Sequence, residues 1–268
     1  MPELPEAVVI ARQMDETVRD KRIESVDILQ PKILNRSGKT VKQILSGLSI
    51  EKVYPFGKWI GIQLSNDHRL MISLGMGGEI IYFEKGESLP DKIRFILHFS
   101  DQSGFYITLW WFGYVHLILP GENHDMTDSL GPDPLEMDRN AFHQILSNRK
   151  GGIKAFLLNQ KRIRGIGNFY IQEILFQAKL HPLRTIPSLS QNDIDTLFNA
   201  IQSVFIESIR LDSSWYEQDF FGKRGGYTLE NMSFTFQEND RCPVCTHPIE
   251  KIKTGSTSQY ICARCQKL

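Results

Sequence analysis

The sequence has no cysteine before residue 242, no long apolar run and no excess of either charge. No stretch approaches the ~18 apolar residues of a membrane-spanning helix. The N-terminus carries acids and prolines where a secretory signal needs a basic and then an apolar segment. These absences predict an intracellular, cytoplasmic protein with no membrane partner. The 41% content of hydrophobic residues is typical of a globular protein with a substantial core.

The absence of net charge removes the simplest argument for nucleic-acid binding. Residues 1–150 contain 17 Lys and Arg against 20 Asp and Glu, a net charge of −3, and residues 151–268 contain 14 against 11, a net charge of +3. This difference is compatible with a DNA-binding second half, but it is weak evidence by itself.

The cysteines are confined to the last 27 residues and form two CxxC pairs with sixteen residues between them. They are Cys242, Cys245, Cys262 and Cys265. Two such pairs supply four thiolates for a tetrahedral zinc ion. Disulfides are disfavoured because the sequence shows no secretion signal. Four sulfur ligands leave no open coordination position, so we predict one structural Zn²⁺ per chain.

The first six residues, Met1-Pro2-Glu3-Leu4-Pro5-Glu6, allow two interpretations. Removal of Met1 would expose Pro2 as a secondary amine, which titrates near 7.7–8.0 and can attack an electrophilic carbon. Glu3 could give or take a proton in that attack. The alternative is structural: the prolines stiffen a helix start and the acids favour its first turn.

Short segments rich in Ile, Phe, Tyr and Trp dominate the first half and are separated by Gly, Asn, Asp and Ser. After a helix over Ala7–Val18, the predicted strands are Ile23–Leu29, Leu48–Tyr54, Trp59–Leu64, Leu70–Ser73, Glu79–Phe83, Arg94–Phe99, Phe105–Trp111 and Tyr114–Leu119. The pattern indicates an antiparallel sandwich or barrel.

Helical spacing replaces this pattern after Leu130-Gly131-Pro132-Asp133-Pro134. The predicted helices are Phe142–Leu146, Ile153–Leu158, Asn168–Ala178 and Gln191–Leu211. We therefore expect an α+β protein with three domains: a β-rich domain at 1–130, a helical domain at 131–230 and a zinc finger at 231–268.

Four further stretches carry chemistry in one interpretation and packing or solvation in the other. Gly165-Ile166-Gly167-Asn168 could offer backbone N–H groups to a phosphate, with Asn168 as N-cap, or form an ordinary helical corner. Lys58 lies between two predicted strands, where most lysines are simply solvated. Met76 is either a core residue or an apolar side chain on an exposed loop tip between glycines. Trp110-Trp111-Phe112 are either core residues or aromatic rings that stack against bases.

Together these stretches resemble the bacterial formamidopyrimidine-DNA glycosylase and endonuclease VIII family, over the whole length of the chain. The shared motifs include the Pro-Glu start, Gly57-Lys58, Leu74-Gly75-Met76, Gly165-Ile166-Gly167-Asn168 and the four-cysteine finger. The resemblance implies an N-terminal β-sandwich flanked by helices, followed by a helix–two-turn–helix domain with a zinc finger. It also implies a bifunctional DNA glycosylase and AP lyase that acts as a monomer on duplex DNA with a damaged, oxidised base or an abasic site.

The resemblance assigns a role to each candidate residue. Pro2 would attack C1′ of the flipped nucleotide and form an iminium, and β- and δ-elimination would follow. Glu3 would protonate the sugar ring oxygen. The remaining roles are phosphate contact for Lys58, Gly167 and Asn168, support for Glu6 and Glu173, and entry into the vacated gap for Met76.

Two positions depart from the family pattern. The chain has Trp110-Trp111-Phe112 where the family has Arg-Arg-Phe, so Phe112 is retained and Trp111 replaces the arginine that contacts the orphaned base. Thr257 replaces the finger arginine that grips the phosphates flanking the lesion. Lys251 and Lys253 are candidates to compensate. The alternative functions are a damaged-DNA-binding protein without turnover and a zinc-ribbon adaptor, although the second leaves the proline start unexplained.

Overall fold

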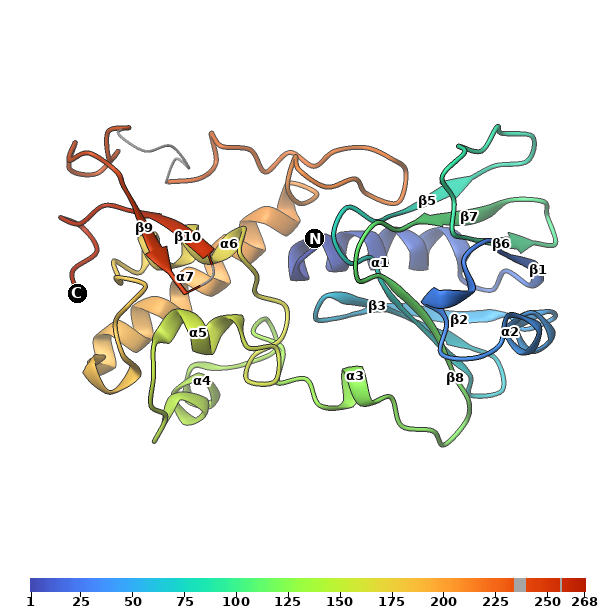
Figure 1. Cartoon of the computed structure of the whole chain (residues 1–268), viewed down its shortest axis with the longest axis horizontal. Coiled ribbons are helices and arrows are strands. Elements are labelled where there is room, and N and C mark those ends of the chain that lie inside the picture. Colours follow the sequence, from blue (N-terminus) through green and yellow to red (C-terminus); the bar gives the residue numbers. More distant parts are fainter. Residues whose placement is uncertain (234–239, 256) are drawn as a thin grey trace. The chain divides into compact units, whose positions relative to one another are not determined.

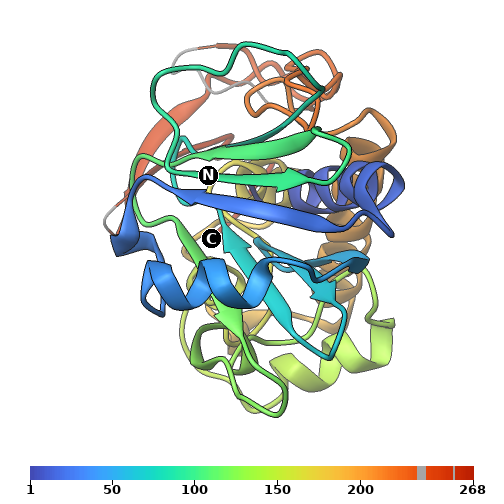
Figure 2. The ribbon, with the colours of Figure 1, turned by 90° about the vertical axis from the view of Figure 1, so that its right-hand side faces the viewer.

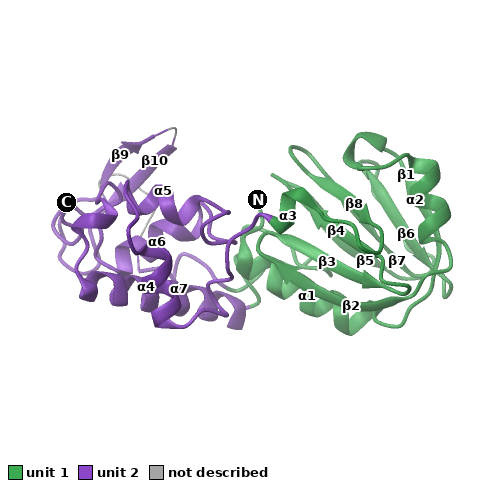
Figure 3. Cartoon of the chain, turned by 90° about the horizontal axis from the view of Figure 1, so that it is seen from below, with its two compact units in different colours: residues 1–128, 212–226 green, residues 129–211, 227–268 purple. Residues whose placement is uncertain are grey.

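The computed structural model describes residues 1–233, 240–255 and 257–268. These residues form two compact units (Figures 1 and 3). Unit 1 contains Met1–Asp128 and Asp212–Gly226, and unit 2 contains Ser129–Leu211 and Tyr227–Leu268. None of the described helices is both long and apolar enough to cross a membrane.

Unit 1 is built around two antiparallel four-stranded sheets, which form two layers (Figure 2). One sheet has the order β1-β6-β7-β5, with β1 at Ile23–Ile28, β5 at Glu79–Phe83, β6 at Phe95–Phe99 and β7 at Gly104–Thr108. The other has the order β2-β3-β4-β8, with β2 at Ile50–Phe56, β3 at Trp59–Leu64, β4 at Arg69–Ser73 and β8 at Tyr114–Ile118. All eight predicted strands are present, and the predicted sandwich is confirmed.

Helix α1 (Leu4–Val18) completes the core of unit 1. Its apolar residues recur at helical spacing, and Ile10, Met14 and Val18 pack in one cluster with residues of both sheets. Pro5 lies in its first turn, where the fixed φ of proline favours a helix start. The sheets and the helix thus share one large apolar core, and the N-terminal residues sit at the end of this rigid element.

Helix α2 (Gly38–Leu45) interrupts the predicted run of strands and was missed in the sequence. The Ser37 side chain caps it by accepting a hydrogen bond from the Thr40 N–H at 3.1 Å. Only Val41 and Leu45 bury fully, so the apolar pattern is too short to separate from a loop by periodicity. Unit 1 also contains the short helices η1 (Pro31–Ile33) and α3 (Asp125–Asp128).

The segment Asp212–Gly226 returns to unit 1 after the long helix of unit 2. Phe220 is fully buried in the core of unit 1, and its carbonyl accepts a hydrogen bond from the Tyr82 N–H at 2.8 Å. The expected second domain, 131–230, includes this segment. The structure instead places it with the first unit, because its apolar anchor packs between residues from early in the chain.

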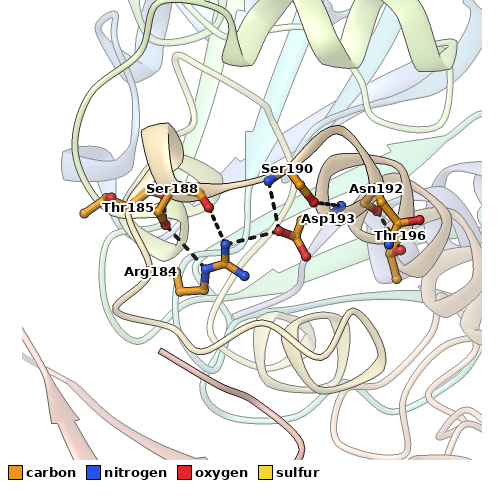
Figure 4. A network of polar contacts seen from close by, with 7 residues as sticks. All are labelled: Arg184, Thr185, Ser188, Ser190, Asn192, Asp193 and Thr196. Atoms are coloured by element: carbon orange, nitrogen blue, oxygen red, sulfur yellow. Dashed lines mark hydrogen bonds and ion pairs between the residues drawn. The ribbon is translucent and has the colours of Figure 1, made fainter.

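The described residues of unit 2 form four longer helices: α4 (Arg139–Leu146), α5 (Ile153–Leu158), α6 (Tyr170–Gln177) and α7 (Gln191–Arg210). The short helix η2 (Ile186–Ser188) leads into α7. Ser190 and Asp193 form a reciprocal capping box at the start of α7, and Arg184 pairs with Asp193 at 3.1 Å (Figure 4). These polar contacts fix the start of the longest helix, since its first turn would otherwise leave unpaired N–H groups.

The C-terminal hairpin of unit 2 consists of β9 (Glu250–Thr254) and β10 (Thr257–Ile261). It packs against α6, whose Phe176 lies in one apolar cluster with Cys242, Ile249 and Cys262. The Tyr260 N–H donates to the Gln172 side chain of α6 at 3.1 Å. The finger is therefore attached to the helical part of its own unit by both apolar and polar contacts.

Candidate active site and nucleic-acid interface

The N-terminal segment is buried and fixed by carboxylates. Pro2, Glu3 and Glu6 are all buried, and Glu3 precedes α1 as its N-cap. The Glu3 N–H donates to Glu6 Oε2 at 2.9 Å, and the Ser214 N–H donates to Glu6 Oε1 at 3.3 Å. Glu6 thus connects the helix start to the segment 212–226 within unit 1, which suits the supporting position expected for it.

Met1 precedes Pro2 and carries the terminal amine of the described chain. This amine donates to Glu217 Oε1 at 2.8 Å. Glu217 was not among the residues singled out in the sequence. No local pattern could have found it, because 216 residues separate the two partners.

Lys58 occupies the second position of the two-residue turn between β2 and β3. Gly57, at the first position, has φ +63°, which a tight hairpin turn requires and glycine allows. The turn is closed by the pairing of Phe56 with Trp59. Lys58 is half-buried, and within the described part of the chain no ion pair engages its ammonium group.

Two loops of unit 1 present large apolar side chains to solvent. The exposed fractions are 45% for Met76, 68% for Trp110, 63% for Trp111 and 65% for Phe112. The Met76 N–H donates to the Trp111 carbonyl at 2.9 Å, so the loops are joined. A Cβ at Gly75 would overlap the same carbonyl, so the close approach requires glycine.

Strand β7 ends at Thr108, earlier than the predicted Trp111. The backbone of Phe112 is left-handed, with φ +57°, so the chain turns at this residue instead of continuing the sheet. Alternation of apolar residues could not reveal this, because three consecutive aromatic residues extend the strand pattern. The structure therefore resolves the sequence ambiguity in favour of an exposed aromatic cluster.

In unit 2, the side chain of Gln160 holds the turn Gly165–Asn168 through two hydrogen bonds to its backbone. Gln160 Oε1 accepts from the Gly165 N–H at 2.8 Å, and Gln160 Nε2 donates to the Ile166 carbonyl at 2.8 Å. Gly165 has φ +95°. The expected N-cap role of Asn168 is wrong by one residue: α6 starts at Tyr170 with Phe169 as N-cap, and Asn168 is exposed.

A cleft of about 380 Å³ in unit 2 brings Asn168 together with the finger hairpin. Lys154, Thr254 and Thr257 also line it. Lys154 Nζ donates to Thr254 Oγ1 at 2.6 Å and to Thr257 Oγ1 at 3.2 Å. Thr257, which takes the place of the family arginine, is thus hydrogen-bonded to a cation from helix α5.

Lys154 is a buried cation, exposed by only 6%. Burial lowers the pKa of its ammonium group, and among the residues that the structure describes no carboxylate pairs with it. A buried charge without a counter-ion is costly, so the cleft is suited to an anion. The two lysines considered in the sequence, Lys251 and Lys253, do not line this cleft.

Glu173 lies on α6 and is fully buried. Its Oε1 accepts from Gln177 Nε2 at 2.7 Å and from the Ser233 N–H at 3.0 Å. These contacts tie the helix to the chain that leads toward the finger. Burial, followed by the Glu173 carboxylate, raises the pKa of the Tyr227 hydroxyl above its ordinary range.

The four cysteines converge at the end of the finger, with all four sulfur atoms within 4.8 Å of one another. The Sγ atoms of Cys242 and Cys265 lie 3.8 Å apart, and those of Cys245 and Cys262 lie 3.4 Å apart. A tetrahedron with Zn–S bonds of 2.3 Å has edges of about 3.8 Å. The donor set therefore fits one structural Zn²⁺, as predicted.

The fold and these residues define a class: proteins with a β-sandwich, a helix–two-turn–helix domain and a four-cysteine zinc finger. Three family models match in that order. They are the N-terminal domain of formamidopyrimidine-DNA glycosylase over residues 1–109, the H2TH domain of the same enzyme over 130–219, and the zinc finger found in FPG and IleRS over 239–268.

Full-length relatives agree with the family models. The chain is 32% identical over 280 residues to the formamidopyrimidine-DNA glycosylase of Chloroflexus aurantiacus, covering 99% of this chain and 98% of that protein. It is 30% identical over 274 residues to the enzyme of Mycoplasma mobile, covering both chains completely. The chain belongs to the formamidopyrimidine-DNA glycosylase family, and the predicted activity, a bifunctional DNA glycosylase and AP lyase, is confirmed.

Solved structures give the same result. The chain matches the wild-type Lactococcus lactis enzyme in complex with DNA containing N7-benzyl-Fapy-dG, with a TM-score of 0.91, 25% identity and complete coverage of both chains. It also matches a structure of MutM with DNA containing carbocyclic 8-oxo-G, with a TM-score of 0.90 and 25% identity over both complete chains.

Proposed function

We propose that the protein acts on duplex DNA, excises an oxidised base with Pro2 as nucleophile and cleaves the strand on both sides of the resulting sugar. One observation carries this proposal: Pro2 directly precedes Glu3, the N-cap of a helix whose start is fixed by the buried carboxylate of Glu6. Such an anchor is useful for a nucleophile, because misplacement by about 1 Å lowers reaction rates strongly.

The chemistry begins after removal of Met1. The Pro2 nitrogen attacks C1′ of the damaged nucleotide, the N–C1′ bond forms, and the base departs with the electron pair of the glycosidic bond. The C1′–O4′ bond then breaks as the iminium forms, and Glu3 delivers a proton to O4′. Loss of a C2′ proton expels the 3′ phosphate, and a second elimination expels the 5′ phosphate.

DNA contacts come from both units in this proposal. Lys58 contacts a phosphate of the lesion strand, and Asn168, Gly167 and Lys154 take phosphates at the turn and cleft of unit 2. These contacts position the duplex without reading its sequence. Lys154, held by Thr257, supplies the positive charge that a finger arginine would otherwise bring.

The aromatic cluster of unit 1 is proposed to fill the gap that the flipped nucleotide leaves. Met76 and Phe112 enter the base stack as apolar wedges, and Trp111 stacks on the orphaned base. Their exposure supports this assignment, because large apolar side chains at loop tips otherwise cost solubility without stabilising the core.

The test is borohydride trapping on protein with a verified Pro2 terminus, using duplexes that contain oxidised purines, oxidised pyrimidines or an abasic site. We expect a covalent adduct with the wild-type protein and none with Pro2→Gly. Glu3→Gln should lose base excision. Asp212→Asn, on an exposed residue paired with Arg12, is the matched control and should trap normally. Absence of an adduct on every duplex would overturn the proposal.

The protein is further proposed to work as a monomer on chromosomal DNA in the cytoplasm. Light scattering of the protein with and without a short lesion duplex should give one protein chain per duplex. A stable dimer at micromolar concentration would contradict this stoichiometry.

A further inference from the structure

Glu217 belongs to the segment 212–226, but its side chain contacts the first residue of the chain. Its Oε1 atom accepts a hydrogen bond from the terminal amine at 2.8 Å, and the residue is only 9% exposed. A buried carboxylate that contacts a terminal amine is unusual, because most termini are solvated. Neither the capping of α1 nor the packing of the core accounts for this contact.

The segment that carries Glu217 is anchored on both sides. Before it, the Ser214 N–H donates to Glu6 at 3.3 Å. After it, Gln13 Nε2 donates to Asp219 Oδ2 at 2.9 Å, and the Phe220 N–H donates to Gln13 Oε1 at 3.0 Å. All these contacts lie within unit 1, so the fold holds Glu217 at the N-terminus through helix α1.

Three charged groups influence the Glu217 carboxyl: the terminal amine, which contacts it, and the Glu6 and Glu79 carboxylates. Burial is the largest influence and raises the pKa of the Glu217 carboxyl, the amine lowers it, and the Glu6 and Glu79 carboxylates raise it again. The net result is a pKa above the ordinary value. A carboxylate with a raised pKa is a stronger base, because proton transfer to it becomes more favourable.

We propose that Glu217 is the proton acceptor for the Pro2 nitrogen in the excision reaction. This inference rests on the proposed role of Pro2 as nucleophile. The Pro2 nitrogen is the next backbone nitrogen after the amine that Glu217 contacts, so removal of Met1 makes it the terminal amine beside this carboxylate.

The proton balance of the reaction requires such a group. Pro2 is a secondary amine, so its nitrogen carries one hydrogen when it attacks C1′. After the N–C1′ bond forms and the base leaves, that nitrogen is positively charged and still holds the hydrogen. Its transfer to Glu217 restores the lone pair, which then forms the C=N bond of the iminium as O4′ departs with the Glu3 proton. Glu217 accepts one proton while Glu3 donates another, so two carboxylates have separate roles.

An electrostatic role would give a different result. A carboxylate that only attracts the amine keeps it protonated, so its removal would lower the amine pKa and increase the fraction of free nucleophile near neutral pH. The reaction would then become faster below the amine pKa. Loss of a proton acceptor would make the reaction slower. The sign of the change in excision rate therefore distinguishes the two roles.

The experiment compares the wild-type protein with Glu217→Gln, Glu217→Asp and Asp212→Asn in single-turnover excision between pH 5.5 and 9.5. Mass spectrometry confirms removal of Met1 in each protein. We expect Glu217→Gln to be roughly 10²-fold slower at pH 6.5, with the deficit narrowing to a few-fold above pH 9, where hydroxide replaces the lost base. Glu217→Asp should recover part of the rate, and Asp212→Asn should match the wild type.

An unchanged or faster Glu217→Gln enzyme at pH 6.5 would overturn the inference, as would a deficit that is constant across the pH range. Failure of the proposed function is distinguishable: the wild-type protein itself would then give no trapped adduct, whereas failure of this inference leaves wild-type trapping intact.

Discussion

Unit 1 and the zinc finger of unit 2 are stabilised by different means. Unit 1 has a large core in which helix α1 packs with the residues of two sheets. The described finger core contains Phe176, Ile249, Cys242 and Cys262, so half of it consists of cysteines. Burial of apolar surface is sufficient for the first, whereas the second depends on metal coordination. The proposed catalytic residues lie in unit 1, whose fold does not depend on a metal. Part of the proposed DNA contacts lies in unit 2 beside the zinc finger, whose fold does.

Removal of zinc should produce the largest difference between the two regions. Cys262→Ser, or a strong chelator, removes a metal whose binding contributes on the order of 10 kcal/mol to comparable fingers. We expect release of one zinc ion, loss of the finger and at least a roughly 100-fold loss of affinity for a lesion duplex. Circular dichroism should show that the β-sheet signal of unit 1 remains.

The matched control is Val244→Ala, which alters an exposed residue between the first two ligands without removing a sulfur. It should keep its zinc and its affinity. Full DNA affinity in zinc-free protein would show that DNA binding does not need the finger, and would contradict the proposed dependence of this region on the metal.

Acid should affect unit 1 through a histidine pair in which His124 is buried and His116 is half-buried. His116 Nδ1 lies 2.9 Å from His124 Nε2. Burial, followed by the neighbouring His124, lowers the pKa of His116 from 6.5 to about 4. The unfolded chain therefore takes up protons before the folded one, so this contribution to stability is complete above pH 6.5 and is lost as the pH falls toward 4.

Denaturant unfolding of unit 1 should show this loss as about 1–2 kcal/mol between pH 6.5 and 4.5, after allowance for a partly exposed ring. His116→Gln should reduce the dependence in this range, because one of the two titrating rings is gone, whereas His124, whose pKa burial also lowers, remains. His98→Gln, which changes a half-buried histidine on β6 of the same unit, is the control and should retain the slope. An identical slope in wild type and His116→Gln would contradict the assignment.

Lys154→Met tests the anion cleft of unit 2. Loss of one phosphate contact should weaken binding to an abasic-site duplex about tenfold and reduce the slope of log K against log salt by about 0.9. Adding Thr257→Arg to Lys154→Met should restore the slope, because a charge returns to the same cleft from the hairpin. A loss of affinity with an unchanged slope and lost zinc would instead indicate a structural lysine.

The strands and the metal site of this protein could be predicted from local signals. Glycine-bounded apolar segments gave β5 and β3 with their observed ends, and the CxxC spacing gave the zinc ligands. The turn position of Lys58 also followed from its place between two strands. Each of these features depends on residues that are neighbours in the chain.

Features that depend on distant residues could not be predicted. Glu217 reaches the terminal amine across 216 positions, and Lys154 meets Thr257 across 103 positions. Their own neighbourhoods look like an ordinary loop and an ordinary amphipathic helix. The finger threonine indicated a missing charge, for which the neighbouring Lys251 and Lys253 were the local candidates, whereas the fold supplies Lys154 from helix α5.

The smallest expected effect concerns the exposed aromatic cluster. Trp111 offers one indole N–H, whereas an arginine offers five donors in a planar fork that can contact a base at two points. Stacking tolerates every base, so we expect wild-type excision rates to differ by less than about threefold among duplexes with C, G, A or T opposite the lesion. Trp111→Arg should introduce a preference of roughly fivefold, about 1 kcal/mol, for one opposite base.

Trp110→Arg places the same charge one residue earlier and should leave the rates nearly equal, so a similar preference in both variants would point to charge alone. Strong discrimination by the wild-type protein would show that other groups read the orphaned base.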